Sequence, residues 1–542
     1  MKNIKIYIAA LFFLLVTGRC KEINPFEGVD LVVSGGAVNS PVLLQFTDAN
    51  PGSSTQPDKV TVKITGDKAA AILDDAGGKN YKVAGNVLTL ILAKEVTASP
   101  SAPVTFTIEV AAPGYLTTSQ TFSLTGSDPA RFVVPMVHVK NPPEGVTAVQ
   151  ATVPVSSGKI TLLDNGTEVG SVGFKSDTKI MDAAGNTISA ANVSAEVLMF
   201  DTEEIQSLAA FPGGLTPASV QLKSGESRSV RFVTAGIAAI NMTAGGKEVK
   251  KFSKPVEVSM AIDPHVKNPQ TGEAIKEGSS IPVWSFETAT GQWKEEGEAV
   301  VYKNEKGQLA GRFEISHLSY WSINYAVLAN NRCSNQYAVF KVSSNVEADL
   351  GNYTGFLFDA QGNFMGSGYG NFNVANGNQT NIIQGNGNLS AGDKLRLEVR
   401  EKVSGKTVAQ TTFDACTEVI PVNITIPDPV KTVAVDIDLA AICKGENLRL
   451  KPSGWFGLYN PATLSYTNVY LQDGKARIYV VEGVEYSLNA FYEGKIYSGK
   501  VTFKRDGSVV IADGNGLAGT TGYDAGSDLI TYKAEYIIAN CK

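Results

Sequence analysis

The 542-residue sequence is poor in charged residues and in histidine. Charged residues make up 18% of the chain, below the roughly 25% of an average soluble domain, and only three histidines are present. Lysine and arginine are scattered along the chain, and the formal net charge is −6. Nucleic-acid phosphates bind to clustered basic side chains. We therefore expect no nucleic-acid partner.

The residues that commonly carry catalysis do not fall into a known arrangement. His138, His265 and His317 lack the spacing of a zinc site, and no Gly-x-Ser-x-Gly motif occurs. Residues 514–519 match the dinucleotide pattern Gly-x-Gly-x-x-Gly, but the residues that follow cannot begin the helix that would hold a pyrophosphate. The sequence therefore indicates no enzyme acting on an external substrate, no metal site and no cofactor.

Long apolar runs are missing after the N-terminus, and none approaches the ~20 residues of a membrane-spanning helix. The N-terminus itself has Lys2 and Lys5, followed by an apolar run from Ile6 to Val16. A positively charged start before a short apolar run is typical of an export signal. The run is too short to span a bilayer, so we expect residues 1–20 to be a signal peptide.

Cys20 follows this run and resembles the acylated cysteine of bacterial lipoproteins. Such a cysteine implies a lipid anchor in a membrane, with residues 21–27 as a spacer. Arg19 departs from the small residues that the lipoprotein peptidase accepts, so cleavage near Gly18 without lipidation is the alternative. The lipoprotein interpretation places the chain in the cell envelope, at the outer membrane of a Gram-negative bacterium, and leaves the leaflet and the face open.

Four further cysteines remain, and no two of them form a Cys-x-x-Cys motif. In an oxidising compartment such cysteines form structural disulfides, and four cysteines allow three pairings. We expect Cys333 to pair with Cys416 and Cys443 with Cys541, because each bond then closes a loop inside one module. A bond between Cys416 and Cys443 would instead join the last two modules.

Glycine is abundant, with 53 residues, and short apolar runs recur between turn residues without a helical period. This spacing is typical of immunoglobulin-like sandwiches. We predict an all-β chain of tandem antiparallel β-sandwich domains, of immunoglobulin-like and transthyretin-like type, after the signal peptide. One helix is predicted from Thr202 to Ala210, with Asp201 as its cap. The predicted modules are residues 21–127, 146–326, 333–426 and 431–542.

The most distinctive stretch lies near the end of the second module, where tryptophans recur around turns. It carries a motif of large envelope and surface proteins, matched by Trp284, Phe286, Thr290, Gly291, Trp293, Glu296, Gly297, His317, Ser319 and Trp321. The stretch resembles the paired β-sandwich module of ankyrins and netrin receptors, some members of which cut themselves at His-Phe-Ser. That resemblance implies self-cleavage before Ser319, assisted by His317, although Leu318 replaces the phenylalanine. We favour the structural alternative, a strand in which Trp321 packs beside Trp284 or Trp293.

The last module is rich in aromatic residues. Its stretch from Phe456 to Gly494 resembles carboxypeptidase-regulatory or transthyretin-like sandwiches. Trp455, Tyr459 and Tyr466 are candidates for stacking on a sugar ring if their rings are exposed. The alternative is that these side chains fill the sandwich core and its rim.

Together these patterns predict a non-enzymatic envelope lipoprotein, a rod of β-sandwich modules that serves adhesion, scaffolding or partner binding. Its partners would be a membrane, through the lipid anchor, and a protein or a glycan that meets exposed edges and loops. One alternative is a surface glycan-binding protein that serves an uptake system. A second alternative is a self-cleaving surface protein.

Overall fold

The computed structural model describes residues 31–34, 39–99, 101–217, 219–328, 333, 337–346, 353–370, 379–384, 389–401, 404–427, 429–443, 448–461, 465–492, 494–512 and 517–538. Within these ranges nearly every element is a β-strand. The exceptions are one α-helix, α2 (Ile205–Ala210), and one short 3-10 helix, η1 (Ala69–Ala71). The predicted all-β fold class is confirmed.

The first module is a sandwich of two sheets. Its strands are β2 (Val42–Asp48), β3 (Thr61–Thr65), β4 (Ile72–Asp74), β5 (Val87–Leu92), β6 (Val104–Ala111), β7 (Thr118–Leu124) and β8 (Ala130–Met136). One sheet has the order β4-β5-β2-β8 and the other β3-β6-β7. Alternate side chains of a strand point to the same face, so Phe46, Phe106 and Phe122 meet in the core between the sheets. The first and last strands, β2 and β8, pair in parallel.

The second module is one 14-stranded sheet that contains the order β10-β11-β18-β21-β20-β19-β22-β16-β13-β9. Ile160 near one end of this order and Val193 near the other belong to the same buried cluster, so the sheet folds back on itself. The strands are β9 (Val146–Pro154), β10 (Lys159–Asp164), β11 (Thr167–Gly173), β12 (Ile180–Met181), β13 (Asn192–Phe200), β14 (Val220–Gln221), β15 (Ser227–Arg228), β16 (Val230–Ala244), β17 (Lys247–Glu248), β18 (Lys251–Ala261), β19 (Ser280–Glu287), β20 (Gln292–Lys303), β21 (Leu309–His317) and β22 (Tyr320–Leu328).

The helix of this module is shorter than predicted. It begins at Ile205 rather than at Thr202, and no side chain caps its first turn. The carboxylate of Asp201 instead accepts a hydrogen bond from the backbone N–H of Glu203, at 2.9 Å. Asp201 thus forms a local turn before the helix, which is the usual competing use of an aspartate at this position.

The third module is a smaller sandwich. Its strands are β23 (Tyr337–Ser344), β24 (Tyr353–Asp359), β25 (Phe364–Gly370), β26 (Gln379–Gln384), β27 (Lys394–Glu401), β28 (Thr407–Asp414) and β29 (Val419–Ile424). They form sheets of order β26-β23-β29 and β25-β24-β27-β28. A disulfide joins Cys333 to Cys416, with the two Cα atoms 5.1 Å apart. This is the pairing that the sequence led us to expect within this module.

The last module has two sheets, one of order β33-β32-β35-β36-β37 and one of order β1-β31-β30-β39-β38 with β34 also paired to β30. Phe456, Ile478 and Phe503 lie in its core. The strands are β30 (Val433–Cys443), β31 (Leu448–Lys451), β32 (Gly454–Asn460), β33 (Ser465–Leu471), β34 (Lys475–Val480), β35 (Glu485–Tyr492), β36 (Lys495–Phe503), β37 (Val509–Ala512), β38 (Leu517–Asp524) and β39 (Leu529–Ile538). Strand β1 (Leu31–Ser34) comes from the N-terminal segment.

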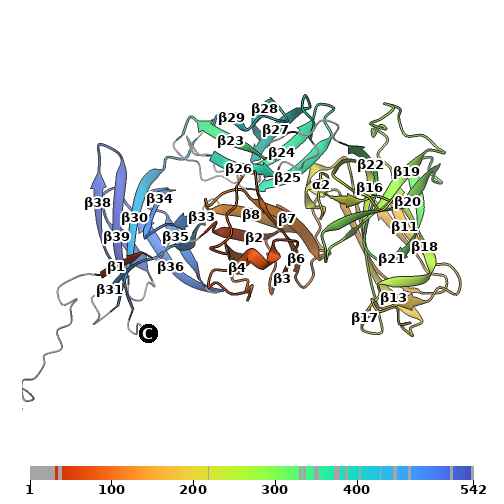
Figure 1. The fold of residues 1–542 in the computed structure, drawn as a ribbon, viewed down its shortest axis with the longest axis horizontal. Coiled ribbons are helices and arrows are strands. Elements are labelled where there is room, and N and C mark those ends of the chain that lie inside the picture. The colour runs from red at the N-terminus through yellow and green to blue at the C-terminus, as the bar shows by residue number, and fades with distance from the viewer. Residues whose placement is uncertain are drawn as a thin grey trace, which may run out of the picture.

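The modules do not follow one another in a row. Figure 1 shows the last module at one end of the long axis, the second module at the other, and the first module between them, with the third module beside the first. The chain therefore runs outward through the first and second modules and returns through the third. The expected rod of β-sandwich modules therefore does not have its modules in chain order along the long axis.

Candidate functional site

The tryptophan-rich stretch forms an aromatic cluster on the outer face of the large sheet. Trp284 and Phe286 of β19 lie with Trp293 of β20 and Tyr320 of β22 in one buried cluster. The rings of Phe286 and Trp293 are 5.0 Å apart. The indole N–H of Trp284 donates to the carbonyl oxygen of Asn324, at 3.1 Å. The stretch is therefore a core element of the second module.

Trp321 does not pack beside Trp284 or Trp293, which corrects the sequence-based expectation. It lies in the other cluster, on the inner face of the sheet, where its ring contacts that of Phe313 at 5.9 Å. Tyr320 and Trp321 are consecutive strand residues, so their side chains point to opposite faces. Tyr320 takes the position on the outer face, opposite Phe286.

The aromatic cluster is shared by three modules. Leu116 and Val137 of the first module and Phe358 and Phe364 of the third belong to the same buried cluster as Trp293. The phenol of Tyr320 donates to the carbonyl oxygen of Thr117 in the first module, at 2.6 Å. Burial raises the pKa of this phenol, so it remains a neutral donor.

A second link joins the second and third modules through an ion pair. Arg231 of β16 and Asp359 of β24 are 2.5 Å apart, and their side chains are only 15% and 7% exposed. Asp359 also accepts hydrogen bonds from the backbone N–H groups of Gln361 and Asn363, at 2.9 and 2.8 Å. Sequence reasoning missed this link, because Arg231 stands in an apolar strand with no local partner.

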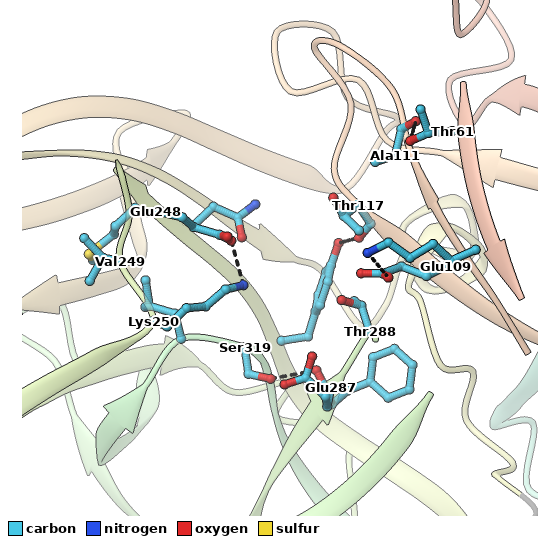
Figure 2. Close-up of a pocket in the computed structure, with 16 residues that line it drawn as sticks. Thr61, Glu109, Ala111, Thr117, Glu248, Val249, Lys250, Glu287, Thr288 and Ser319 are labelled. Carbon is cyan, nitrogen blue, oxygen red and sulfur yellow. Dashed lines mark hydrogen bonds and ion pairs between the residues drawn. The ribbon is translucent and has the colours of Figure 1, made fainter. Parts of the chain in front are cut away.

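A polar cleft lies beside the aromatic cluster, between the first and second modules (Figure 2). Its volume is about 310 Å³, near the lower end of the range for small-molecule sites. One wall includes Thr61 of β3 and Thr117, and the other includes Glu287 at the end of β19, Thr288 after it, and Ser319. The cleft was not predicted, because its walls come from two modules.

Two ion pairs with solvent-accessible lysines border the cleft. The Lys63 ammonium lies 3.1 Å from the Glu109 carboxylate in the first module, and Lys250 lies 2.6 Å from Glu248 in the second. Both lysines are solvent-accessible, at 77% and 41% exposure. Pairs of this kind contribute little to stability, and their donors and acceptors can reorient toward hydroxyl or charged groups of a partner.

The candidate self-cleavage residues His317 and Ser319 have separate partners. The Ser319 hydroxyl donates to the carbonyl oxygen of Phe286, at 2.7 Å. His317 Nε2 lies 3.4 Å from Glu296 Oε1, and its ring lies 4.9 Å from that of Trp321. Self-cleavage would need the serine hydroxyl at the Leu318 carbonyl and the histidine beside it. These contacts support the structural alternative.

Glu296 is the most connected acidic side chain near this turn. Burial opposes its ionisation, but hydrogen bonds from His317, Lys294 and Ser285 outweigh burial and lower its pKa to about 2. The distances from Oε1 to the Lys294 Nζ and Ser285 Oγ atoms are 2.9 and 3.0 Å. Glu296 therefore stays ionised and joins β19, β20 and the end of β21.

The proposed stacking residues of the last module are not equally available. Trp455 is only 7% exposed and packs with Phe491 against Leu43 and Val87 of the first module. Its face is therefore not open to a sugar, which corrects the expectation for this residue. Tyr459 and Tyr466 are half-buried and their rings are 5.6 Å apart. Part of each tyrosine ring therefore remains accessible to a ligand.

The remaining predicted sites lie outside the described residues, wholly or in part. The lipidation residue Cys20 is outside them, as is Cys541. Cys443 ends β30, and its pairing with Cys541 stays a prediction that non-reducing peptide mapping can check. No helix in the described ranges is long and apolar enough to cross a membrane.

One cluster of the described residues has atoms suited to a metal ion. Ligand atoms of Glu203, Asp263 and His265 lie within 4.8 Å of one another. A hydrogen bond from the imidazole to Glu203 and the nearby carboxylate charges raise the pKa of His265, which favours the protonated form over the neutral form that binds metals. Glu203 and His265 are exposed, and an ion pair accounts for the arrangement.

Residues 184–327 match the family model described as FAM171A1/A2/B, N-terminal. This match covers about a quarter of the chain and falls within the second module. It includes the whole aromatic stretch from Trp284 to Trp321.

Solved structures with partial similarity include three bacterial proteins. A C-terminal fragment of the pilus adhesin SpaC from Lactobacillus rhamnosus GG is 8% identical, with a TM-score of 0.15 over 38% of this chain and 99% of that chain. The TIE protein of Bacillus anthracis is 10% identical, with a TM-score of 0.13 over 90% and 76%. BcpA, the major pilin subunit of Bacillus cereus, is 7% identical, with a TM-score of 0.14 over 93% and 100%. Similarity at this level carries no argument about function.

Proposed function

We propose that the chain is a non-enzymatic, lipid-anchored protein of the cell envelope that holds β-sandwich modules in a fixed arrangement for adhesion, scaffolding or partner binding. The observation that carries this proposal is the aromatic cluster shared by three modules. A buried apolar cluster of this size resists hinge motion, because separating the modules would expose aromatic surface to water. A fixed arrangement suits a protein that presents surfaces at set positions.

The polar cleft between the first and second modules is the proposed contact point for a partner. Its rims carry lysines and carboxylates from both modules, and its volume of about 310 Å³ would admit a sugar unit or a polar side chain of a protein. Because the two walls are fixed by the aromatic cluster, the cleft is formed before a ligand arrives. Preorganisation of this kind favours binding.

The test is binding by the purified chain from Lys21 to Lys542, with Lys63→Ala and Lys250→Ala as cleft variants. We expect binding to immobilised envelope glycans or envelope proteins that falls at least tenfold when both lysines are replaced. Lys533→Ala, on an exposed position of the last module, is the matched control. Retained binding by the double variant would remove the cleft from the proposal, and turnover of a ligand would overturn the non-enzymatic assignment.

A surface glycan-binding protein that serves an uptake system is the second candidate function. The observation that favours it is the half-buried ring pair of Tyr459 and Tyr466 beside polar groups of the same sheet. Tyr466 OH is hydrogen-bonded to Asn489, and the Asn489 Oδ1 accepts from Ser498, at 2.7 Å. Rings beside amide and hydroxyl groups match the chemistry of sugar binding. Glycan-array binding that disappears in Tyr459→Ala but persists in the cleft variants would favour this function.

A further inference from the structure

Strand β1 belongs to the last module, although it precedes the first module in the sequence. Leu31–Ser34 pairs in parallel with Leu448–Lys451 of β31, residue for residue. Strand β31 pairs with β30, and β30 pairs with β39. Strand β1 is therefore an edge strand of this sheet, and the described part of the chain begins at the last module.

A second contact holds the last module next to the strand that follows β1. Leu43 of β2 and Val87 of β5 pack with Trp455 and Phe491 of the last module in a small buried cluster. The side-chain amide of Asn468 donates to Gln45 Oε1, at 3.2 Å. The N-terminal part of the chain thus meets the last module at two places, through backbone pairing and through apolar packing.

We propose that the last module is the end of the molecule that faces the membrane, and that the second module is the end presented to external partners. This proposal rests on the lipid anchor at Cys20 in the proposed function. Residues 21–30 separate Cys20 from Leu31. Eleven Cα steps reach at most about 40 Å even when fully extended, so Leu31, where β1 begins at the edge of this sheet, stays within that distance of the lipid.

The arrangement reverses the order that a simple tandem chain would have. In a row of modules anchored at the N-terminus, the first module would lie nearest the membrane and the last module farthest away. Figure 1 instead shows β1 with the last module at one end of the long axis and the second module at the other. The polar cleft between the first and second modules is thereby held away from the lipid surface, where a soluble or cell-surface partner can reach it.

Energy transfer from the protein to a lipid surface tests this orientation. The chain from Lys21 to Lys542, with a hexahistidine tag in place of residues 1–20, binds phosphatidylcholine vesicles that contain a nickel-chelating lipid and a fluorescent acceptor lipid. A donor dye is attached at Lys533→Cys in the last module or at Lys247→Cys in the second module, both exposed strand positions. The parent chain without an added cysteine measures labelling of its own cysteines. Because the tag replaces the acyl group, this result is independent of whether Cys20 is lipidated.

We expect transfer from Lys533→Cys to exceed transfer from Lys247→Cys at least threefold. Equal transfer, or stronger transfer from the second module, would overturn the proposal. This comparison uses surface substitutions only, so it does not require any disruption of the fold.

A second experiment tests whether β1 sets the orientation. Successive backbone N–H groups of a strand alternate in direction, so Val32→Pro with Val33→Pro removes one donor that faces β31. We expect faster amide hydrogen exchange in peptides that contain residues 448–451 and a smaller difference between the two dye positions. Val32→Ile with Val33→Ile is the matched control. Unchanged exchange and unchanged transfer in the proline variant would show that β1 does not hold the anchor segment at the last module.

Discussion

Glu296 of β20 is the acidic side chain that contacts His317 at the end of β21. It is partly buried, and its three hydrogen-bond donors lower its pKa to about 2, although burial alone would raise the pKa. A carboxylate whose pKa is lower in the folded state than its usual value of about 4.3 stabilises the fold above that value. This contribution is lost as the pH falls from about 4.3 toward 2.

We predict that Glu296→Gln lowers the stability of the second module at pH 7, by at most about 1 kcal/mol because the side chain is partly exposed to solvent. The difference from the wild type should shrink as the pH falls through the same window. Urea unfolding followed by tryptophan fluorescence at pH 7, 4 and 2.5 measures this change. Glu305→Gln, at an exposed turn, is the control, and a difference that stays constant with pH would contradict the role of Glu296.

Ser319 provides the second prediction at this scale. Its hydroxyl donates to the Phe286 carbonyl oxygen, and His317 Nε2 lies 3.4 Å from Glu296 Oε1, so both groups are engaged with partners other than the Leu318 carbonyl. We predict that the wild type and Ser319→Ala both run as one intact chain on denaturing electrophoresis and in intact-mass measurement. The variant should lose about 1 kcal/mol of stability with its hydrogen bond. A fragment that starts at Ser319 and disappears in Ser319→Ala would demonstrate self-cleavage.

Single residues were predictable where the strand period decides their position. The motif contains Trp284, Phe286 and Trp293, which the folded chain buries in one cluster. It misplaced Trp321, because neighbouring strand residues face opposite sides: Tyr320 pairs with Phe286 of β19, and Trp321 pairs with Ser285. The burial of Trp455 also escaped prediction, because the residues that cover it belong to the first module.

At the scale of elements, β16 and β24 are joined by the buried pair of Arg231 and Asp359. Removing one partner leaves the other charge buried without compensation, which costs roughly 3 to 5 kcal/mol in comparable cases. We predict that Arg231→Met weakens the attachment of the third module to the second by an amount of this order. Three of the four tryptophans lie in the second module, so fluorescence-detected unfolding reports on this region.

The matched control for this prediction is the exposed pair of Lys394 and Asp414, whose side chains are 59% and 55% exposed. Lys394→Met should change the unfolding curve by less than about 1 kcal/mol. If Arg231→Met and Lys394→Met behave alike, the ion pair does not hold the modules together.

Elements with a clear period were predicted well, and elements defined by distant partners were not. The strands near Val87–Leu92 and Val104–Ala111 follow directly from short runs rich in apolar and β-branched residues. Strand β1 has no such signal, because it is a strand only through its pairing with β31, more than 400 residues away in the sequence. Pairing of this kind depends on the folded position of the partner edge, which periodicity does not encode.

At the scale of the whole molecule, the path of the chain determines which module lies next to the N-terminal anchor segment. The sequence indicates separate β-sandwich modules. It does not distinguish the apolar residues that pack in the core of one module from those that pack between two modules. Val87 and Leu43 illustrate this, since both belong to ordinary strands of the first module yet contact the last module. The return of the chain, and with it the position of the N-terminal segment, therefore emerged only from the folded arrangement.

The anchor itself gives the last prediction. We expect Cys20→Ala to move the protein from the membrane fraction to the soluble fraction, because acyl chains bind a bilayer through about 0.8 kcal/mol per buried CH₂ group and that contribution is lost with the sulfur. Fractionation of cells that express the wild type or the variant, with a high-salt wash to remove peripheral protein, measures this change. Cys443→Ala, in β30 of the last module, should remain in the membrane fraction and controls for loss of a cysteine. Retention of Cys20→Ala in membranes after the wash would mean that another part of the chain, or a partner, provides the attachment.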